Sequence, residues 1–276
     1  MSASQPDADA QPDPRHTHRS IPDVFREVFD HDYSPLGSSA RVRDEFNQIT
    51  DRFAFGEMWP ASGLDDRRKI LVSVACVATS GGDELSALLR AGLHLGVAAE
   101  ELQEVFHQIA PYVGISRARH GLEVLDKLVD APVDIQSTAT EDDRLAKGIA
   151  AQKAMFGDGI DTMRENAPED ESFIQDALSA YCFGDTYTRK ALSLADRELL
   201  TWVAIISLGG CDPQARAHVS GNLAVGNDRA ILLGALAVCV PWIGFPRSLN
   251  ALAAINSQTK NDVAEDKTAE NDDKES

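Results

Sequence analysis

Glu198, Cys211 and His218 are the residues of this chain whose types and spacing suit acid–base or thiol chemistry. A carboxylate, a thiol and an imidazole in one pocket transfer protons near neutral pH. Cys211 stands directly before Asp212-Pro213, where a helix is expected to begin, and the helix dipole there favours a thiolate. Asp212 beside it opposes that effect. If the helices that carry Glu198 and His218 pack antiparallel, the three side chains converge.

The elements that position these residues are predicted to be helices. Glu198 falls in a helix over Ala195–Leu208 and His218 in a helix over Pro213–Val225, with Asp212 as its N-cap and Gly226 at its end. Ala and Leu dominate the middle of the chain, and no segment alternates with a period of two for long enough to predict a strand. Further helices are expected over Asp44–Phe55, from Asp65/Asp66, over Leu85–Leu95, from Ala99, and over Arg117–Leu128, Phe173–Tyr181, Asp228–Val240 and Arg247–Ile255.

The chain contains an internal repeat. Pro111-Tyr112-Val113-Gly114-Ile115-Ser116-Arg117 reappears as Pro241-Trp242-Ile243-Gly244-Phe245-Pro246-Arg247, 130 positions later. Phe55-Gly56-Glu57 reappears as Phe183-Gly184-Asp185, and Gly81-Gly82 as Gly209-Gly210, both at an offset of 128. Three matches in the same order predict two tandem units.

The repeat gives each candidate residue an internal control. At these offsets Ile70 corresponds to Glu198, Leu88 to His218, and a position near Gly81 or Asp83 to Cys211. The polar groups are absent together from the first unit. We therefore expect the second unit to carry the chemistry and the first to be a scaffold.

The predicted organisation has five parts. They are a disordered tail over residues 1–20, a degenerate unit over 21–131, a linker over 132–141, the unit with the candidate site over 142–256, and an acidic disordered tail over 257–276.

Composition limits the function classes. The net charge is −18, so the electropositive footprint that nucleic-acid binding needs is absent. The longest apolar stretch, Ala230–Pro241, is shorter than the ~20 residues of a membrane span, and residues 1–20 lack the apolar core of a signal peptide. Four cysteines without a C-x-x-C pair suit a reducing compartment. These features predict a cytoplasmic protein with neither nucleic-acid nor membrane partners.

The motifs resemble those of the carboxymuconolactone decarboxylase family, within the alkylhydroperoxidase D-like superfamily. They are Phe-Gly-(Glu/Asp), Arg197-Glu198-Leu199, Gly-Gly-Cys-Asp-Pro-Gln-x-Arg-x-His and Pro-(Tyr/Trp)-x-Gly-x-x-Arg. The resemblance implies an all-α fold of two tandem alkylhydroperoxidase D-like helical units. Units of this kind form hexamers in the family, so it also implies a homo-oligomer, a trimer of tandem chains.

The resemblance also implies the reaction. The peroxidase branch has a Glu, a C-x-x-C and a His seven residues after the first Cys. Cys211 and His218 keep that spacing, but Gln214 replaces the second cysteine, so the usual intramolecular disulfide cannot form. This favours the decarboxylase branch, a lyase without cofactor that acts on a small carboxylated lactone or related acid. Two alternatives remain: a peroxiredoxin-type thiol peroxidase using Cys211, and a non-enzymatic oligomeric binding protein.

For a lyase, the candidate catalytic residues are His218, Glu198 and Cys211. Arg216, Arg197 and Arg247 are candidates for holding the substrate carboxylate by paired hydrogen bonds. No metal or cofactor is expected, although a zinc site from Cys211, His218 and Glu198 is a less favoured alternative.

Overall fold

The structure, a computed structural model, describes residues 20–31, 44–133, 135 and 137–272. Every regular element within these ranges is helical, and no strand occurs in them. This confirms the predicted all-α fold.

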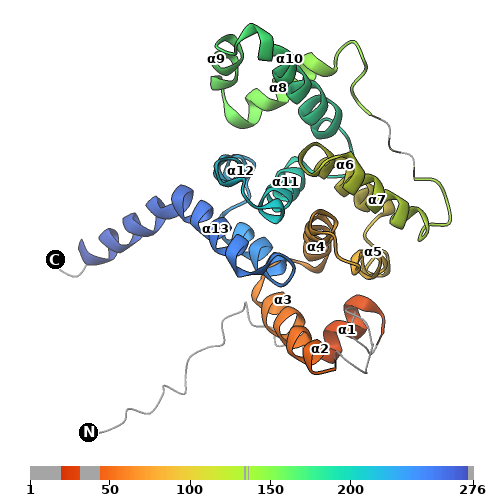
Figure 1. Ribbon diagram of the computed structural model, residues 1–276. Helices are drawn as coiled ribbons and strands as arrows, with labels where there is room; N and C mark the ends of the chain where they lie inside the picture. The colour runs from red at the N-terminus through yellow and green to blue at the C-terminus, as the bar shows by residue number, and fades with distance from the viewer. Residues whose placement is uncertain (1–19, 32–43, 134, 136, 273–276) are drawn as a thin grey trace.

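The helices of the first unit all precede those of the second along the chain (Figure 1). The first unit contains α1 (Ile21–Phe29), α2 (Asp44–Asp51), the π-helical η1 (Arg52–Met58), α3 (Trp59–Ala61), α4 (Asp66–Ser80), α5 (Leu85–His94), α6 (Ala99–Val113) and α7 (Ile115–Asp126). The second contains α8 (Arg144–Phe156), α9 (Gly159–Glu165), η2 (Glu169–Glu171), α10 (Ser172–Ala177), the π-helical η3 (Leu178–Tyr187), α11 (Leu194–Leu208), α12 (Asp212–Ala224) and α13 (Arg229–Asp272).

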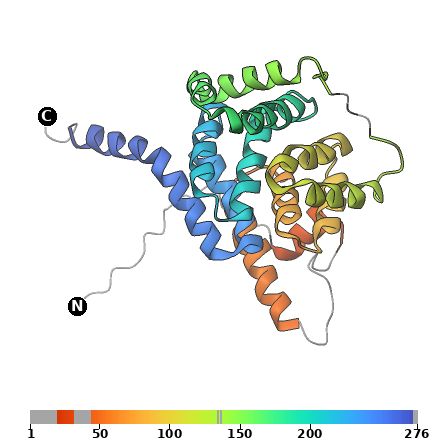
Figure 2. The same ribbon diagram turned by 45° about the horizontal axis from the view of Figure 1, so that its top comes forward.

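The two units pack through equivalent helices. α4 and α11 lie side by side in the centre, α6 packs on α11, and α13 packs on α4 (Figure 1). The groups α1–α3 and α8–α10 lie at opposite ends of this arrangement (Figure 2). One continuous apolar core runs through both units, and a smaller cluster of Met155, Cys182, Phe183 and Tyr187 lies beside it.

Hydrogen bonds at the helix ends fix the correspondence between the units. Asp65 caps α4 by accepting from the Arg68 amide at 2.8 Å, and Ser193 caps α11 by accepting from the Asp196 amide at 3.0 Å. This offset of 128 pairs Ile70 with Glu198.

The ends of α5 and α12 fix the second offset. The Val97 amide donates to the Gly92 carbonyl and the Asn227 amide to the Asn222 carbonyl, both at 2.9 Å. Each bond spans a glycine with positive φ, Gly96 at 77° and Gly226 at 90°, as helix C-caps require. This offset of 130 pairs Leu88 with His218, as the sequence predicts.

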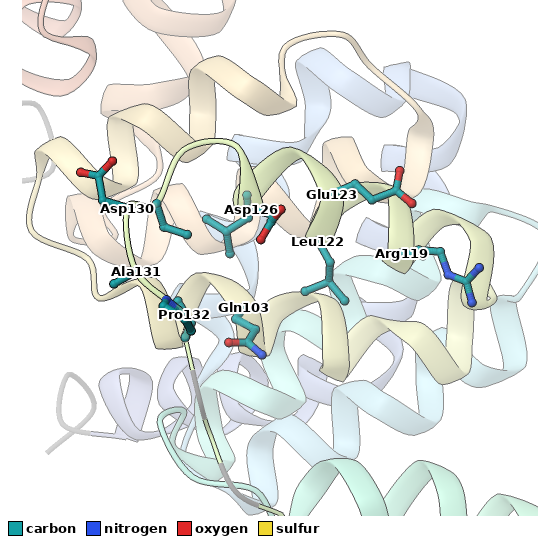
Figure 3. Close-up of a pocket in the computed structure, with 11 residues that line it drawn as sticks. Gln103, Arg119, Leu122, Glu123, Asp126, Asp130, Ala131 and Pro132 are labelled. Carbon is teal, nitrogen blue, oxygen red and sulfur yellow. The ribbon is translucent and has the colours of Figure 1, made fainter.

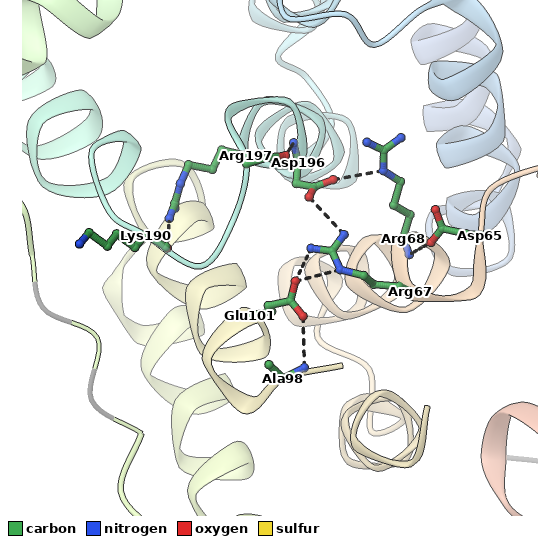
Figure 4. A network of polar contacts seen from close by, with 9 residues as sticks. Asp65, Arg67, Arg68, Ala98, Glu101, Lys190, Asp196 and Arg197 are labelled. Atoms are coloured by element: carbon green, nitrogen blue, oxygen red, sulfur yellow. Dashed lines mark hydrogen bonds and ion pairs between the residues drawn. The ribbon is translucent and has the colours of Figure 1, made fainter. Parts of the chain in front are cut away.

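Ion pairs also join the units. Asp196 on α11 binds Arg67 at 3.1 Å and Arg68 at 3.2 Å, both on α4, and Arg67 in turn binds Glu101 on α6 (Figure 4). The central helices are therefore held in register by charged groups at one end as well as by the core.

Several boundaries differ from the sequence prediction. Cys211 takes the N-cap position of α12 and Asp212 is the first residue inside the helix, one position away from the expected register. Asp228–Val240 and Arg247–Ile255 belong to one element, α13, which non-helical φ/ψ angles at Gly244 interrupt. Helices α1, α8 and α9 were not predicted.

The predicted tails and linker fall at the limits of the described residues. Residues 1–19 lie outside them, and no described helix lies between α7 and α8, where the linker is predicted. α13 continues to Asp272, into the tail that the sequence predicts from residue 257, and projects away from the other helices (Figure 1). The stretch 257–272 contains neither proline nor glycine to end a helix.

Among the described residues, the stretch Arg229–Thr259 of α13 meets the length and composition of a membrane span, with a mean hydropathy of 1.7. About two fifths of its most apolar window, 39%, is buried within the protein. The predicted absence of a membrane partner therefore stays a prediction.

Candidate active site

The side chains of Glu198 and His218 meet between α11 and α12. Glu198 Oε1 lies 2.6 Å from His218 Nδ1. Glu198 is completely buried, and His218 is 8% exposed. This places a carboxylate against one nitrogen of an imidazole at the edge of the core.

The second oxygen of Glu198 is also bound. Tyr187 Oη, at the end of η3, donates to Oε2 at 2.6 Å and lies 2.9 Å from Thr201 Oγ1. Asn222 Nδ2 donates to the main-chain carbonyls of Glu198 at 3.1 Å and His218 at 2.7 Å. These bonds fix both the carboxylate and the two helices that carry the pair.

Gly221 makes room for the carboxylate. A Cβ at this position would lie 2.3 Å from Glu198 Oε1 and 3.2 Å from the Phe156 ring. Any larger residue on this face of α12 would displace Glu198 or Phe156. The glycine is thus part of the site, although it carries no chemistry.

Two aromatic rings enclose the imidazole. The Tyr112 and Phe156 rings lie edge-on to His218, with centroid distances of 5.7 and 5.6 Å and interplanar angles of 85° and 88°. Phe156 comes from α8 and Tyr112 from α6 of the first unit. The site therefore contains residues of both units.

The hydroxyl and thiol groups around Glu198 stay neutral. Burial, reinforced by neighbouring negative charge, raises the pKa of Tyr112 and of Tyr187 well above the usual value of a phenol. Burial raises the pKa of the Cys182 thiol to about 12, although its hydrogen bond to Tyr112 partly counters that shift. Tyr187 is therefore a hydrogen-bond donor to Glu198 at neutral pH, and Cys182 is no thiolate nucleophile.

This arrangement can transfer a proton. With Glu198 ionised, His218 Nδ1–H donates to the carboxylate and Nε2 is left to take or give a proton. A carboxylate and an imidazole in this arrangement are chemically suited to general acid–base catalysis.

Cys211 does not join this pair. It lies at the start of α12, about 10 Å along the helix from His218. The half-buried thiol has its Sγ 3.6 Å from the Gly209 carbonyl oxygen. It lines a cavity of about 10 Å³ together with Arg247, room for about one water molecule. Of the three residues predicted to converge, the structure brings two together.

The three predicted carboxylate-binding arginines lie in different surroundings. Arg197 is 1% exposed and donates to Glu104 at 2.8 Å and to Gln108 at 3.0 Å. It also donates to the Lys190 carbonyl at 2.7 Å (Figure 4). Arg247 is exposed and donates to the Ser207 carbonyl at 2.7 Å. Arg216 is exposed on α12, two residues before His218.

Sequence reasoning missed the residues that support the pair, chiefly Tyr187, Thr201, Tyr112 and Phe156. The repeat held a usable signal for Tyr187, because the offset of 128 pairs this tyrosine with Trp59. Tyr187 therefore brings a hydroxyl where the first unit has the Trp59 indole, and a hydroxyl close to the expected Glu–His pair is a candidate hydrogen-bond partner of the Glu198 carboxylate. Phe156 carried no signal, since its helix was not predicted.

A larger cavity, of about 610 Å³, lies away from this site in the first unit (Figure 3). It is bounded by α6, α7 and the segment after α7, and its lining includes Gln103, Arg119, Leu122 and Glu123. Within the described ranges, no cluster of three or more His, Cys, Asp or Glu residues is arranged to hold a metal ion.

Comparison with known proteins places these features in a family. The carboxymuconolactone decarboxylase family matches the chain twice, over residues 44–127 and 174–257. The chain is also similar to 4-carboxymuconolactone decarboxylase of Acinetobacter baylyi, with 31% identity over 85 residues, which is 30% of this chain and 63% of that protein. The chain thus spans somewhat less than two thirds of that relative. With one matched region in each helical unit, this protein belongs to the carboxymuconolactone decarboxylase family as a tandem member.

Proposed function

We propose that this protein is a lyase that works without a cofactor and decarboxylates a small carboxylated lactone or a related unsaturated acid. The observation that supports this most is the buried contact between Glu198 and His218, with Tyr187 as a neutral donor to the same carboxylate. The similarity to a protein named 4-carboxymuconolactone decarboxylase supports the reaction class.

The chemistry of the proposal balances around one proton. The bond between the substrate carbon and its carboxylate breaks, and the carboxylate leaves as CO₂. The electron pair of that bond enters the conjugated system of the unsaturated lactone. His218 in its imidazolium form then returns a proton to carbon through Nε2, and water replaces the proton on His218. Glu198 keeps the ring oriented through the bond to Nδ1.

The carboxylate of the substrate needs a cationic partner. We propose Arg216 for this role, because it is exposed on α12 near His218, whereas both terminal nitrogens of Arg197 already bind protein acceptors. Arg247 is a second candidate, next to Cys211. Replacement of the correct arginine by alanine should raise KM much more than it lowers kcat.

The test is a direct assay of the purified chain with a carboxylated unsaturated lactone. Loss of the lactone is followed by ultraviolet absorbance, and CO₂ release is measured in parallel. His218→Ala and Glu198→Gln should each lower kcat by roughly 10²–10⁴-fold, because a positioned general acid or base contributes that much.

His120→Ala is the matched control, since His120 is an exposed histidine of the first unit. It should leave kcat unchanged. Wild-type rates in the His218→Ala variant, with a family of carboxylated lactones tested, would exclude the proposed role of the pair.

The same preparations distinguish the two other functions. A thiol peroxidase would reduce hydroperoxides with an external thiol and lose all activity in Cys211→Ser, whereas the lyase should survive that change better than His218→Ala. Mass spectrometry after peroxide treatment would show a sulfenic acid on Cys211 only in the first case. Ligand binding without turnover of either substrate would favour the binding protein.

We also propose a homo-oligomer, with a trimer of tandem chains as its expected form. Its support is a matched pair of apolar side chains on the surface: Ile115 is 64% exposed and Phe245, its equivalent, is 59% exposed. Sedimentation equilibrium of the wild type and of a variant with both residues changed to Ser would measure the state. A cytoplasmic location, with neither membrane nor nucleic-acid partners, is proposed alongside and is tested by cell fractionation.

A further inference from the structure

One face of α6, in the first unit, carries three polar side chains that all contact the second unit. They are Glu104, Gln108 and Tyr112, spaced four residues apart, which places them on one stripe of the helix. We call these three residues the α6 stripe. Glu104 and Gln108 are completely buried, so their contacts are made inside the core.

Tyr112 is the member of the stripe closest to the imidazole. Its ring lies edge-on to His218, and its hydroxyl lies 3.4 Å from Tyr187 Oη and accepts from Cys182 Sγ at 3.0 Å. Tyr187 is the residue that donates to Glu198. Tyr112 therefore contacts the His218 ring directly and reaches Glu198 through Tyr187, the hydrogen-bond donor to that carboxylate.

Gln108 reaches the same donor, Tyr187, through Thr201. Its Nε2 donates to Thr201 Oγ1 at 3.0 Å, and Thr201 Oγ1 lies 2.9 Å from Tyr187 Oη. Its Oε1 accepts from Arg197 at 3.0 Å. Gln108 thereby limits the directions in which the Thr201 hydroxyl can point, and so which bond Tyr187 makes.

Glu104 anchors the stripe. It accepts from Arg197 at 2.8 Å and from Arg189 at 2.7 Å, both residues of the second unit. The interactions form one continuous chain from Glu104 through Arg197, Gln108, Thr201 and Tyr187 to Glu198 and His218.

The equivalent face of the second unit has no such groups. At the offset of 130, Gly234, Val238 and Trp242 take the places of Glu104, Gln108 and Tyr112. The polar stripe exists only on the unit that lacks the Glu–His pair, and it faces only the unit that has one.

From this asymmetry we propose that the first unit is a working part of the active site. The α6 stripe supplies positioning residues, above all Tyr112 and Gln108, that orient Tyr187 on Glu198 and thereby hold His218 in the geometry for proton transfer. This rests on the proposed acid–base role of the Glu198–His218 pair.

The test compares Tyr112→Phe and Gln108→Leu with Trp242→Phe, the matched change on the other unit. The first readout is the proton NMR resonance of His218 Nδ1–H, which a short hydrogen bond to a carboxylate shifts far downfield. Uniformly ¹⁵N-labelled protein and His218→Ala assign that resonance. Thermal unfolding of each variant shows that it is folded.

We expect the resonance to move or to broaden in Tyr112→Phe and in Gln108→Leu, and to stay in place in Trp242→Phe. In the lyase assay, kcat should fall by about 10- to 100-fold in the two stripe variants with little change in KM, because misplacement of a catalytic group costs that much. Trp242→Phe should keep the wild-type kcat.

An unchanged resonance in both folded stripe variants would overturn the inference, whatever the assay shows. If the wild type converts no lactone but the resonance still responds to the stripe, the proposed reaction fails and the positioning role stands. The two failures are therefore distinguishable.

Discussion

The first and second units place different side chains on one scaffold. Phe29 packs edge-on against Phe55 at 5.3 Å in the first unit, and Phe156 packs edge-on against Phe183 at 6.1 Å in the second. The helix caps also match. The apolar frame that surrounds the site was therefore kept in both units, and a difference in chemistry did not require a difference in fold.

The polar groups differ together. Glu198, His218 and Tyr187 stand where the first unit has Ile70, Leu88 and Trp59. Ile70 and Leu88 are fully buried, so aliphatic groups fill the space that the pair takes in the second unit. A buried polar group without a hydrogen-bond partner is costly. This explains why the three polar residues are present together in one unit and absent together from the other.

A trace of the network remains in the first unit. Ser73 corresponds to Thr201, and its hydroxyl is buried with no hydrogen-bond partner among the described residues; the same holds for the Trp59 indole nitrogen. Such orphaned groups cost free energy. Thr201, by contrast, is bonded to Gln108 and Tyr187. The comparison teaches that the two units divide the polar groups between them: the second carries the Glu198–His218 pair, and the first carries the stripe that contacts it.

The largest expected effect comes from making the second unit like the first. Glu198→Ile combined with His218→Leu should lower lyase kcat by roughly 10²–10⁴-fold. The free energy of unfolding should change by no more than ~2 kcal/mol, because apolar replacement of a complete buried pair is often tolerated. Steady-state kinetics and urea unfolding measure the two quantities, and an active double variant would refute the asymmetry.

A second prediction concerns the equivalent cations Arg197 and Lys69. Arg197→Met should lower the free energy of unfolding by ~3–5 kcal/mol, because Glu104 stays buried in the core with one partner fewer. Lys69 lies over the Trp59 ring at 5.4 Å and 3.5 Å from Asp66, an arrangement worth about 0.5–2 kcal/mol. Urea unfolding measures both changes. Equal losses of unfolding free energy for Arg197→Met and Lys69→Met would show that the buried Arg197–Glu104 contact stabilises the fold no more than the Lys69 contacts do.

A third prediction tests the space beside the carboxylate. Gly221→Ala puts a methyl group where Glu198 Oε1 lies, so we expect kcat to fall by about 10- to 100-fold and stability by ~1–3 kcal/mol. The equivalent residue of the first unit is already Ala91, beside no carboxylate. Gly159→Ala, at a position with no atom within 4 Å of the new Cβ, is the control and should leave both quantities unchanged. Wild-type kinetics in Gly221→Ala would mean that Glu198 moves without consequence.

The smallest expected effect is on alkaline stability. The Cys182 thiol has a pKa of about 12 in the folded chain and near 9.0 when unfolded, so the unfolded state releases its proton first. Its contribution to stability is complete below about pH 9 and is lost as the pH rises toward 12. The free energy of unfolding should thus fall between pH 9 and 11, and less steeply in Cys182→Ser. Urea unfolding at a series of pH values measures this. Parallel curves of unfolding free energy against pH for the wild type and Cys182→Ser would contradict the burial of this thiol in the native state.

Much of the helical frame follows from local sequence signals. Asp65 and Ser193 cap α4 and α11, and Gly96 and Gly226 end α5 and α12, because these residue types satisfy helix ends or adopt positive φ at low cost. Helices α1, α8 and α9 escaped prediction. The chain also continues as helix to Asp272, because a polar composition does not itself prevent helix formation.

The candidate site could be predicted from the sequence only in part. Glu198 and His218 were identified because the repeat offered an apolar counterpart for each, and the sequence determined their types and the helices that carry them. Cys211 shared the same motif, but seven residues along a helix separate the two side chains by about 10 Å, and the packing of α11 decided which one met Glu198.

The sequence by itself determined the duplication, the helical class and three candidate residues, Glu198, Cys211 and His218. Only the tertiary structure decided that Tyr187, Tyr112 and Gln108 surround that pair and that Arg197 faces Glu104. The physical reason is that helix periodicity reports which face of a helix is buried, whereas the partner of that face depends on how distant helices pack. Here the face of α11 that carries Arg197 and Thr201 meets Gln108 on α6 of the other unit.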